Sequence, residues 1–235
     1  MKFSVDPAIF EKFPGVSLGA LVIDHMDNRG HSEEILKLLR NEETNQKQLL
    51  TNVELGTLPE IAAWRRIYKT FGSDPHDYRS SVESLLRRAR GGAKPLPQIN
   101  NLVDLYNYIS IKYHVPVGAE NLDAMEGDLW LRFASGTEGG RALGSDVDET
   151  CYNGEVVYTD EAGFVCRRWN WREAERTKIE ESTTHAVMVI EKVPEVADGV
   201  FDLALAEAEV LIKQFLHGNC KTIQLDNNLV SVDLS

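Results

Sequence analysis

The chain has 235 residues, of which 43% are hydrophobic and 26% are charged, and its formal net charge is −12. This composition is typical of a globular protein and excludes a collagen-like, low-complexity or mostly disordered chain. Because an evenly spread negative charge repels phosphate, the charge also argues against indiscriminate binding of nucleic acid.

The first elements expected along the chain are a strand and a helix. An uninterrupted run of small and apolar residues predicts a buried strand over 17–24. Residues 57–71 carry apolar side chains at helical spacing, with Pro59 in the first turn and Gly72 at the C-terminal cap. This segment therefore predicts an amphipathic helix.

Two further helices are expected in the middle of the chain. Ser80 and Glu83 have the spacing of a capping box, in which a hydroxyl and a carboxylate satisfy the free amides at a helix start. The helix that follows is expected to end at residues 91–92, which are both glycine. Asn101, with Asp104 three residues later, is predicted to cap the next helix.

The second half of the chain alternates apolar and polar residues and predicts strands. The expected elements are strands at 129–133, 155–160, 164–171 and 185–190, a helix at 200–216 capped by Gly218, and one or two strands within 222–234. A turn at 161–163 would join the second and third strands into a hairpin. We therefore expect an α+β fold in a single domain spanning 1–235, with helices in the N-terminal half and a mixed or antiparallel sheet in the C-terminal half.

The sequence gives no indication of a metal, a cofactor or a disulfide. The cysteines are odd in number without a C-x-x-C pair, the histidines are scattered, and the glycine-rich segments match neither a phosphate-binding loop nor a dinucleotide fingerprint. Ser80 and Ser81 lack a nucleophile elbow, so one of them is interpreted as a helix cap. No run of about 18 apolar residues occurs, and the first 30 residues contain charges, so we expect a cytoplasmic protein without a membrane segment or signal peptide.

Positive charges gather in two segments. Residues 64–94 contain eight basic and three acidic side chains, and residues 167–178 contain five and two. Such islands in an acidic chain can form a local anion site, or they can be the solvated faces of helices and strands. The spacing of the residues is compatible with both interpretations.

The second strand of the expected hairpin combines arginine with tryptophan. In an extended strand, Arg167, Trp169 and Trp171 would share one face, and Arg168 and Asn170 would share the other. A guanidinium beside an indole can stack on it and still present donors to a phosphate or a carboxylate. The pattern therefore predicts either a ligand-binding wall or tryptophans that cover a core edge beneath arginine side chains.

Two segments in the middle of the chain resemble a known family. Residues 99–108 read I-N-N-L-V-D-L-Y-N-Y, and residues 116–123 read P-V-G-A-E-N-L-D. In order and spacing they resemble the segments P-I-N-N-V-V-D-x-x-N-Y and P-L-H-A-F-D-L-D of bacterial phenylalanyl-tRNA synthetase β subunits. Together with 64–68, 78–83, 155–163 and 181–184, they make the chain similar to freestanding B3/B4 domain proteins over about residues 3–218.

The resemblance implies an editing domain, which in the synthetase hydrolyses the ester of a wrongly attached amino acid in a pocket between two sublayers. A second site is needed because an apolar synthesis pocket discriminates between near-isosteres by only about 1–3 kcal/mol. No protein nucleophile is obligatory, since the ribose hydroxyl of the substrate can help to orient the water. We therefore expect a trans-acting aminoacyl-tRNA deacylase without a cofactor or metal, whose partner is the tRNA 3′ end or its aminoacyl ester.

Two departures from the synthetase pattern predict a reshaped pocket. Gly118 stands where the synthetase segment has a histidine, and residues 168–172 replace a small glycine-rich loop. We therefore expect tyrosine specificity to be lost and a more polar pocket to take a different amino-acid ester. The residues expected to bind the substrate are Arg79, Ser80, Asn101, Gly118, Glu120, Arg168, Trp169, Asn170, Trp171 and Arg172. The residues expected to bind tRNA are Arg65, Arg87, Arg88, Arg90, Lys94, Arg176 and Lys178.

A non-catalytic interpretation is also open. A B3/B4 module could keep the pocket for a free amino acid, a small metabolite or RNA and lack hydrolysis. Asn101, Asp104 and Asn107 could likewise be purely structural, with Asn101 as a helix cap. Salt separates tRNA binding from binding of a small neutral ligand, because binding through several phosphates weakens steeply as salt rises and binding of a small neutral ligand does not.

Overall fold

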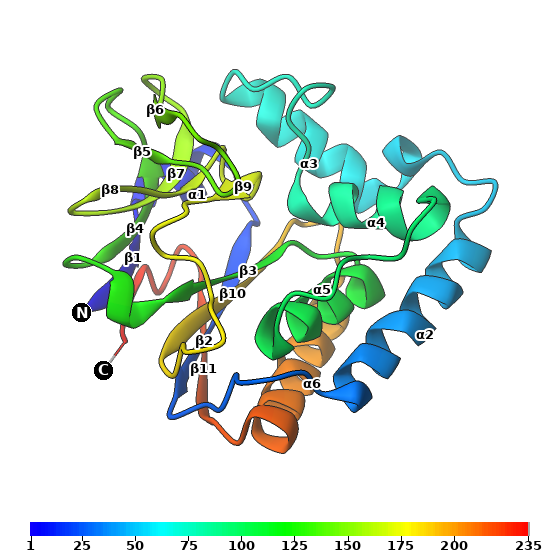
Figure 1. Ribbon diagram of the computed structural model, residues 1–235. Coiled ribbons are helices and arrows are strands. Elements are labelled where there is room, and N and C mark those ends of the chain that lie inside the picture. Colours follow the sequence, from blue (N-terminus) through cyan, green and yellow to red (C-terminus); the bar gives the residue numbers. More distant parts are fainter. Residues whose placement is uncertain (235) are drawn as a thin grey trace.

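The chain forms two main sheets and a group of helices, shown in Figure 1 as a computed structural model that describes residues 1–234. The α-helices are α1 (Pro7–Lys12), α2 (Glu33–Leu49), α3 (Pro59–Thr70), α4 (Ser81–Gly91), α5 (Asn101–Tyr113) and α6 (Asp198–Leu216). Two short 3₁₀ helices, η1 (Leu55–Thr57) and η2 (Leu122–Ala124), lie in connecting segments. None of the described helices has the length and apolar character needed to cross a bilayer.

One sheet has six strands and mixed direction. Its order is β12 (Ser231–Asp233), β1 (Lys2–Val5), β4 (Leu129–Phe133), β7 (Val156–Asp160), β8 (Gly163–Arg167) and β9 (Arg172–Glu173). Strands β1 and β4 are parallel, and the other neighbours are antiparallel. The pairing of β1 with β12 brings the two ends of the described chain together, as Figure 1 shows.

The second sheet has four antiparallel strands. Its order is β11 (Asn219–Leu225), β2 (Ser17–Asp24), β10 (Ala186–Lys192) and β3 (Val117–Asn121). A separate ribbon pairs β5 (Gly139–Arg141) with β6 (Asp148–Thr150). The chain passes repeatedly between the two main sheets, because β1 and β2, β3 and β4, β9 and β10, and β11 and β12 each belong to different ones.

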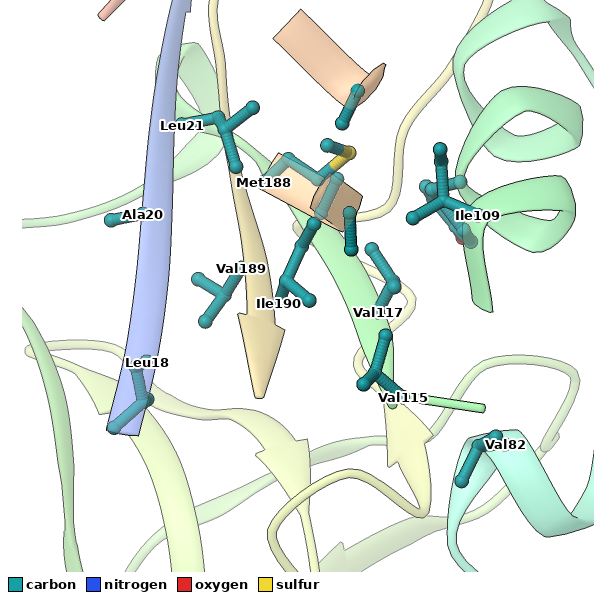
Figure 2. Packing of buried hydrophobic residues seen from close by; sticks show 14 of the residues in the cluster. Leu18, Ala20, Leu21, Val82, Ile109, Val115, Val117, Met188, Val189 and Ile190 are labelled. Atoms are coloured by element: carbon teal, nitrogen blue, oxygen red, sulfur yellow. The ribbon is translucent and has the colours of Figure 1, made fainter. Parts of the chain in front are cut away.

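The four-stranded sheet is covered on both faces. Helices α5 and α6 pack against one face, and α2 packs on α5 and α4. Figure 2 shows Met188, Ile190 and Val117 directed toward Ile109 of α5, whereas Val189 points to the opposite side of the sheet. Burial on both faces explains why β2 and β10 consist of nearly continuous apolar runs.

The α+β class is confirmed. The division into a helical N-terminal half and a C-terminal half of strands is approximate, because strands β1 and β2 lie within the first 24 residues and α6 lies near the C-terminal end. The strands expected at 17–24, 129–133 and 185–190, the hairpin around 161–163 and the helix at 57–71 are present. The sequence patterns did not predict α2, α1 or β1.

The expected strand over 164–171 is interrupted after Arg167. Arg168 and Trp169 have positive φ angles of 48° and 66°, so the chain turns before it pairs again in β9. The backbone N–H of Trp171 donates to the carbonyl of Arg167 and closes this turn. The turn carries the Trp169 indole into the core, where it contacts Trp64 and Phe13, and burial of this large side chain outweighs the extended pattern.

The expected helix caps are confirmed only in part. Ser80 occupies the N-cap position of α4 as expected, but its side chain makes no cap hydrogen bond, and Glu83 is buried and pairs with Arg65 instead of reaching back. Asn100, and not Asn101, caps α5 by accepting from the backbone N–H of Val103 at 3.1 Å. At the end of α6, His217 takes the left-handed conformation expected of Gly218.

Candidate functional site

A pocket of about 300 Å³ lies where the two sheets meet helices α4 and α5. The four-stranded sheet contributes residues of β3 and β10, and the six-stranded sheet contributes residues of β4, β7, β8 and β9. Val187, Val189 and Glu191 alternate along β10, so the pocket lies on the sheet face turned away from Ile190 and Met188. Most of the lining is apolar or aromatic, as in small-molecule sites generally.

Three glutamates line this pocket and come from different strands. Glu120 lies on β3, Glu173 on β9 and Glu191 on β10. Within residues 1–234, none of the three forms a salt bridge. A carboxylate without a cationic partner in an apolar cavity is costly, so these groups distinguish the pocket from ordinary core.

Glu191 is held by three hydrogen-bond donors. Trp169 donates from Nε1 to Oε1 at 2.9 Å, the Tyr158 hydroxyl donates to the same oxygen, and the Asn170 amide donates to Oε2. Burial raises the pKa of Glu191 to about 7, although these three hydrogen bonds favour its charged form. The result is an oriented carboxyl group that exchanges a proton near neutral pH.

Glu120 and Glu173 interact with each other at another part of the pocket. Burial raises the pKa of Glu120 well above its usual value, and repulsion from Glu173 adds to this effect. Burial raises the pKa of Glu173 to about 7, partly offset by a hydrogen bond from the backbone of Ala119. A Cβ atom at Gly118 would lie 2.9 Å from Oε1 of Glu173, so the absence of a side chain there makes room for this carboxylate.

Two arginines line the pocket and remain exposed to solvent. These are Arg88 on α4 and Arg172 on β9. The Arg172 guanidinium lies 4.6 Å from the centroid of the Trp171 ring, which is consistent with a cation–π contact. The pocket therefore combines buried and half-buried carboxyl groups inside with exposed arginine side chains at its solvent-facing edge.

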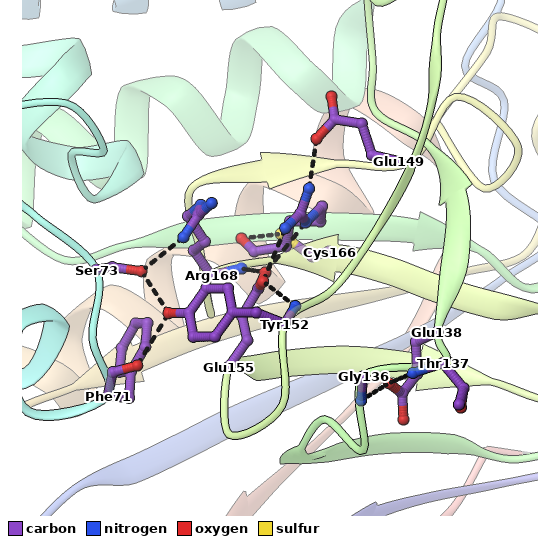
Figure 3. Close-up of polar contacts among 11 residues, drawn as sticks. Phe71, Ser73, Gly136, Thr137, Glu138, Glu149, Tyr152, Glu155, Cys166 and Arg168 are labelled. Atoms are coloured by element: carbon purple, nitrogen blue, oxygen red, sulfur yellow. Dashed lines mark hydrogen bonds and ion pairs between the residues drawn. The ribbon is translucent and has the colours of Figure 1, made fainter.

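The structure brings together six of the ten residues expected to bind the substrate. The six that line the pocket are Gly118, Glu120, Trp169, Asn170, Trp171 and Arg172. Arg168 does not line it, because its guanidinium lies 3.6 Å from the Tyr78 ring centroid. The same guanidinium donates to Ser73 at 3.0 Å, as Figure 3 shows.

The other three residues expected to bind the substrate also lie outside the pocket lining. Ser80 is buried, and its hydroxyl has no hydrogen-bond partner within the described chain. Arg79 lies 3.9 Å from Glu83, and Asn101 accepts a hydrogen bond from the backbone of Ser32, immediately before α2. Asn101 therefore links α5 to the start of α2 and does not line the pocket.

Most of the residues expected to bind tRNA have protein partners. Arg65 forms two hydrogen bonds with Glu83, at 2.9 and 2.6 Å. The remaining contacts are Arg87 with Glu83, Arg90 with the Val53 carbonyl, Arg176 with Asp160, and Lys178 with Glu175 and Glu180. Lys94 is exposed, and among the seven residues Arg88 is the one that lines the pocket.

Sequence reasoning missed Glu173 and Glu191, together with Tyr106 and Tyr158, which also line the pocket. The signal for Glu191 was its place in the apolar strand H-A-V-M-V-I-E-K. It shares the strand face of Val187 and Val189, so a charged side chain there faces what is otherwise buried surface. Glu173 gave no comparable signal, because it follows a turn that the pattern did not predict.

A second polar cluster lies outside the pocket lining. Nδ1 of His25 and Nε2 of His185 lie 2.6 and 2.8 Å from the same Asp24 oxygen, and the three potential metal-ligand atoms lie within 4.8 Å of one another. Nδ1 of His185 faces Asp123 at 3.0 Å. The scattered histidines of the sequence did not predict this grouping.

Comparisons with known proteins relate the chain to one family. A model of the B3/4 domain family matches residues 63–207, which is more than half of the chain. The phenylalanine–tRNA ligase β subunit of Fusobacterium nucleatum is 36% identical over 74 residues, which are 32% of this chain and 9% of that protein. A crystal structure of an N-terminal fragment of the Pyrococcus horikoshii phenylalanyl-tRNA synthetase β subunit aligns over 94% of this chain and 53% of the fragment, with 14% identity and a TM-score of 0.43.

Proposed function

The chain belongs to the B3/4 domain family, and from this premise we propose that it hydrolyses the ester bond of misacylated tRNA, acting in trans. The observation that carries the proposal is the oriented carboxyl group of Glu191 inside an apolar pocket. A general base is most effective when its pKa lies near the working pH, and the pKa of Glu191 is about 7. The related synthetase subunits supply the substrate class, an aminoacyl ester of tRNA.

The proposed reaction uses water as the nucleophile. The Glu191 carboxylate removes a proton from a water molecule as the water oxygen bonds to the ester carbonyl carbon. The tetrahedral intermediate then breaks the bond between this carbon and the ribose oxygen, and Glu191 returns the proton to that oxygen. The products are a free amino acid and tRNA with an intact ribose hydroxyl, and no protein nucleophile is needed.

The pocket offers separate surroundings for the two parts of this substrate. Its apolar and aromatic lining suits an aminoacyl side chain, and the solvent-facing Arg88 and Arg172 suit the phosphates of the tRNA 3′ end. Phosphate contacts position a nucleic acid without reading its sequence, and a net charge of −12 limits further contacts. We therefore propose that recognition is concentrated at the 3′ end.

A second candidate is a module that binds an amino acid or a small metabolite without hydrolysis. The pairing of Arg65, Arg176 and Lys178 with carboxylates favours it, because these cations are less available to phosphate. In this interpretation Glu191 fixes the Trp169 turn and does not activate water.

A deacylation screen separates the two candidates. Purified chain is mixed with tRNAs that each carry a noncognate amino acid, and loss of the ester is followed against the spontaneous rate. We expect at least one pair to be hydrolysed well above background and Glu191→Gln to remove most of that rate. If no pair exceeds the background although amino-acid amides bind in the pocket, hydrolysis is excluded and the binding module remains.

A further inference from the structure

The part of the pocket formed by β3 and β9 holds two carboxyl groups that have no cationic partner within the described residues. Glu120 is 7% exposed, and its Oε2 is buried without a hydrogen-bond partner within the described residues. Glu173 lines the same region, and its negative charge opposes ionisation of Glu120. An unpartnered carboxylate oxygen inside a cavity is a site that a ligand donor can complete.

The charged groups of the protein around Glu120 do not supply this donor. Arg176 is the cation that favours ionisation of Glu120, but its guanidinium donates to Asp160 at 2.7 Å and to the Ala124 carbonyl at 2.8 Å. Asp160 is itself negative and disfavours a second charge nearby. Arg88 and Arg172 are exposed, and neither forms a salt bridge with Glu120 or Glu173 in the described chain. The Thr177 hydroxyl also favours ionisation of Glu120 but carries no charge. A bound cation would supply the positive charge that stabilises both carboxylates.

The register of the sheet places Glu120 away from the proposed base. Glu120 is opposite Val187 on the neighbouring strand, four residues before Glu191 on the same face. Four strand residues span roughly 13 Å. A ligand whose ester lies near Glu191 therefore needs an extended side chain to reach Glu120, and a long side chain with a terminal cation fits both the spacing and the charge.

We infer that this pocket selects an amino acid with a long, positively charged side chain, of the lysine or arginine type, and holds its terminal cation between Glu120 and Glu173. The inference rests on the proposed function for the location of the ester and not for the acidic subsite itself. A buried ion pair of this kind strongly disfavours the isostere without the charge, because the two carboxylates are then left without a partner. Gly118 contributes by leaving space for Glu173.

Calorimetric titration of the full chain with amino-acid amides tests this inference without requiring hydrolysis. At pH 7.5, L-lysinamide is compared with L-norleucinamide, which has the same carbon chain without the ammonium group, and L-argininamide with L-citrullinamide. We expect each cationic amide to bind at least 10-fold more tightly than its neutral counterpart. L-glutaminamide tests a neutral hydrogen-bond donor, and equal binding of this amide would overturn the requirement for charge.

Matched variants test whether Glu120 and Glu173 cause the preference for cationic amides. Glu120→Gln and Glu173→Gln keep the shape of the side chains, and each should reduce the preference for the cation at least several-fold. Glu11→Gln, at an exposed position on α1, should leave the preference unchanged. Thermal unfolding of each variant confirms that it is folded.

The outcomes separate this inference from the proposed hydrolysis. Norleucinamide that binds as well as lysinamide, absence of binding by either cationic amide, or an unchanged preference in both Gln variants would each overturn the inference, even if some tRNA were deacylated. Selective binding of cationic amides without deacylation of any tRNA would support the acidic subsite and contradict the proposed catalysis.

Discussion

Nε1 of Trp169 lies 2.9 Å from Oε1 of Glu191, so the turn after β8 is hydrogen-bonded to the carboxylate that β10 directs into the pocket. The same indole is fully buried and meets Trp64 and Phe13 edge-on, with ring centroids 5.2 Å apart in each pair. One side chain therefore stabilises the core and orients the proposed base.

Trp169→Phe should affect both roles. The variant leaves a buried carboxylate without one donor and leaves part of the indole volume empty, so we expect a loss of about 2–4 kcal/mol in the free energy of unfolding. Because the deleted hydrogen bond favours the charged form of Glu191, its pKa should rise further above 7. Urea unfolding measures the first effect. Trp130→Phe, at a 40% exposed position, is the control and should change stability by less than about 0.5 kcal/mol.

A second test concerns the buried ion pair between Glu155 and Arg167, which lies beside this turn. Glu155 Oε2 accepts from Arg167 at 2.8 Å, and its Oε1 accepts from the backbone N–H of Arg168. Figure 3 shows Glu155 beside Arg168 and Tyr152. Glu155→Gln leaves a buried guanidinium without its main counter-charge, which should cost about 3–5 kcal/mol. Asp148→Asn breaks the exposed pair with Arg141 and should cost less than about 1 kcal/mol in the same unfolding assay.

Much of the local structure could be predicted from periodicity. The apolar run of β2, the amphipathic pattern of α3 and the turn between β7 and β8 each depend on residues close together in the sequence. The turn at Arg168 and Trp169 does not, because it depends on Trp64, Phe13 and Glu191, which are distant in the chain. The alternating pattern of residues 164–171 therefore predicted two strand faces for Arg168 and Trp169, although the chain turns at these two residues.

The site was predictable only in part for the same reason. Gly118 and Glu120 were found because their segment resembles a known family, and Trp169 to Arg172 because of their composition. Arg168 belongs to the same segment rich in arginine and tryptophan, yet its guanidinium stacks on Tyr78 and donates to Ser73. No sequence pattern indicates these two contacts. The acidic character of the pocket arises only when β3, β9 and β10 meet, so sequence reasoning expected arginines and tryptophans to dominate it.

Stability should depend on pH through Glu173. Its pKa is about 7 in the folded chain against an ordinary 4.5, so the folded state binds more protons between these values. The contribution of the Glu173 carboxyl group to the free energy of unfolding is therefore fully present below pH 4.5, and it is lost as pH rises through 7. Glutamine does not ionise, so Glu173→Gln removes this loss. We expect the free energy of unfolding of the variant, relative to that of wild type, to increase by about 1–3 kcal/mol from pH 5 to pH 8; this range allows for solvent screening, because Glu173 is half-buried. Unfolding curves at the two pH values measure the difference, and an equal effect at both would contradict the assignment.

Hydrolysis should follow the ionisation of Glu191. Because the proposed base must be deprotonated, the single-turnover rate should rise with pH, with an apparent pKa of about 7, and level off above it. Glu191→Gln should lower the plateau rate at least about 100-fold and remove the inflection. Glu173→Gln should retain the inflection, since Tyr158, Trp169 and Asn170 still surround Glu191. A wild-type rate that is flat from pH 5.5 to 8.5 would exclude Glu191 as the base.

The contribution of Arg88 and Arg172 to tRNA binding should be visible in the salt dependence of the affinity. Arg88 and Arg172 line the pocket and are exposed, so they can reach phosphates of a single-stranded 3′ end while the ester occupies the interior. Removal of one arginine–phosphate interaction should reduce the slope of log affinity against log salt by about 0.7. Arg88→Gln and Arg172→Gln should therefore weaken tRNA binding and flatten this slope, with no comparable effect on amino-acid amides. Arg141→Gln, whose arginine already pairs with Asp148, is the matched control. An unchanged slope in the double variant would show that the tRNA end approaches by another surface.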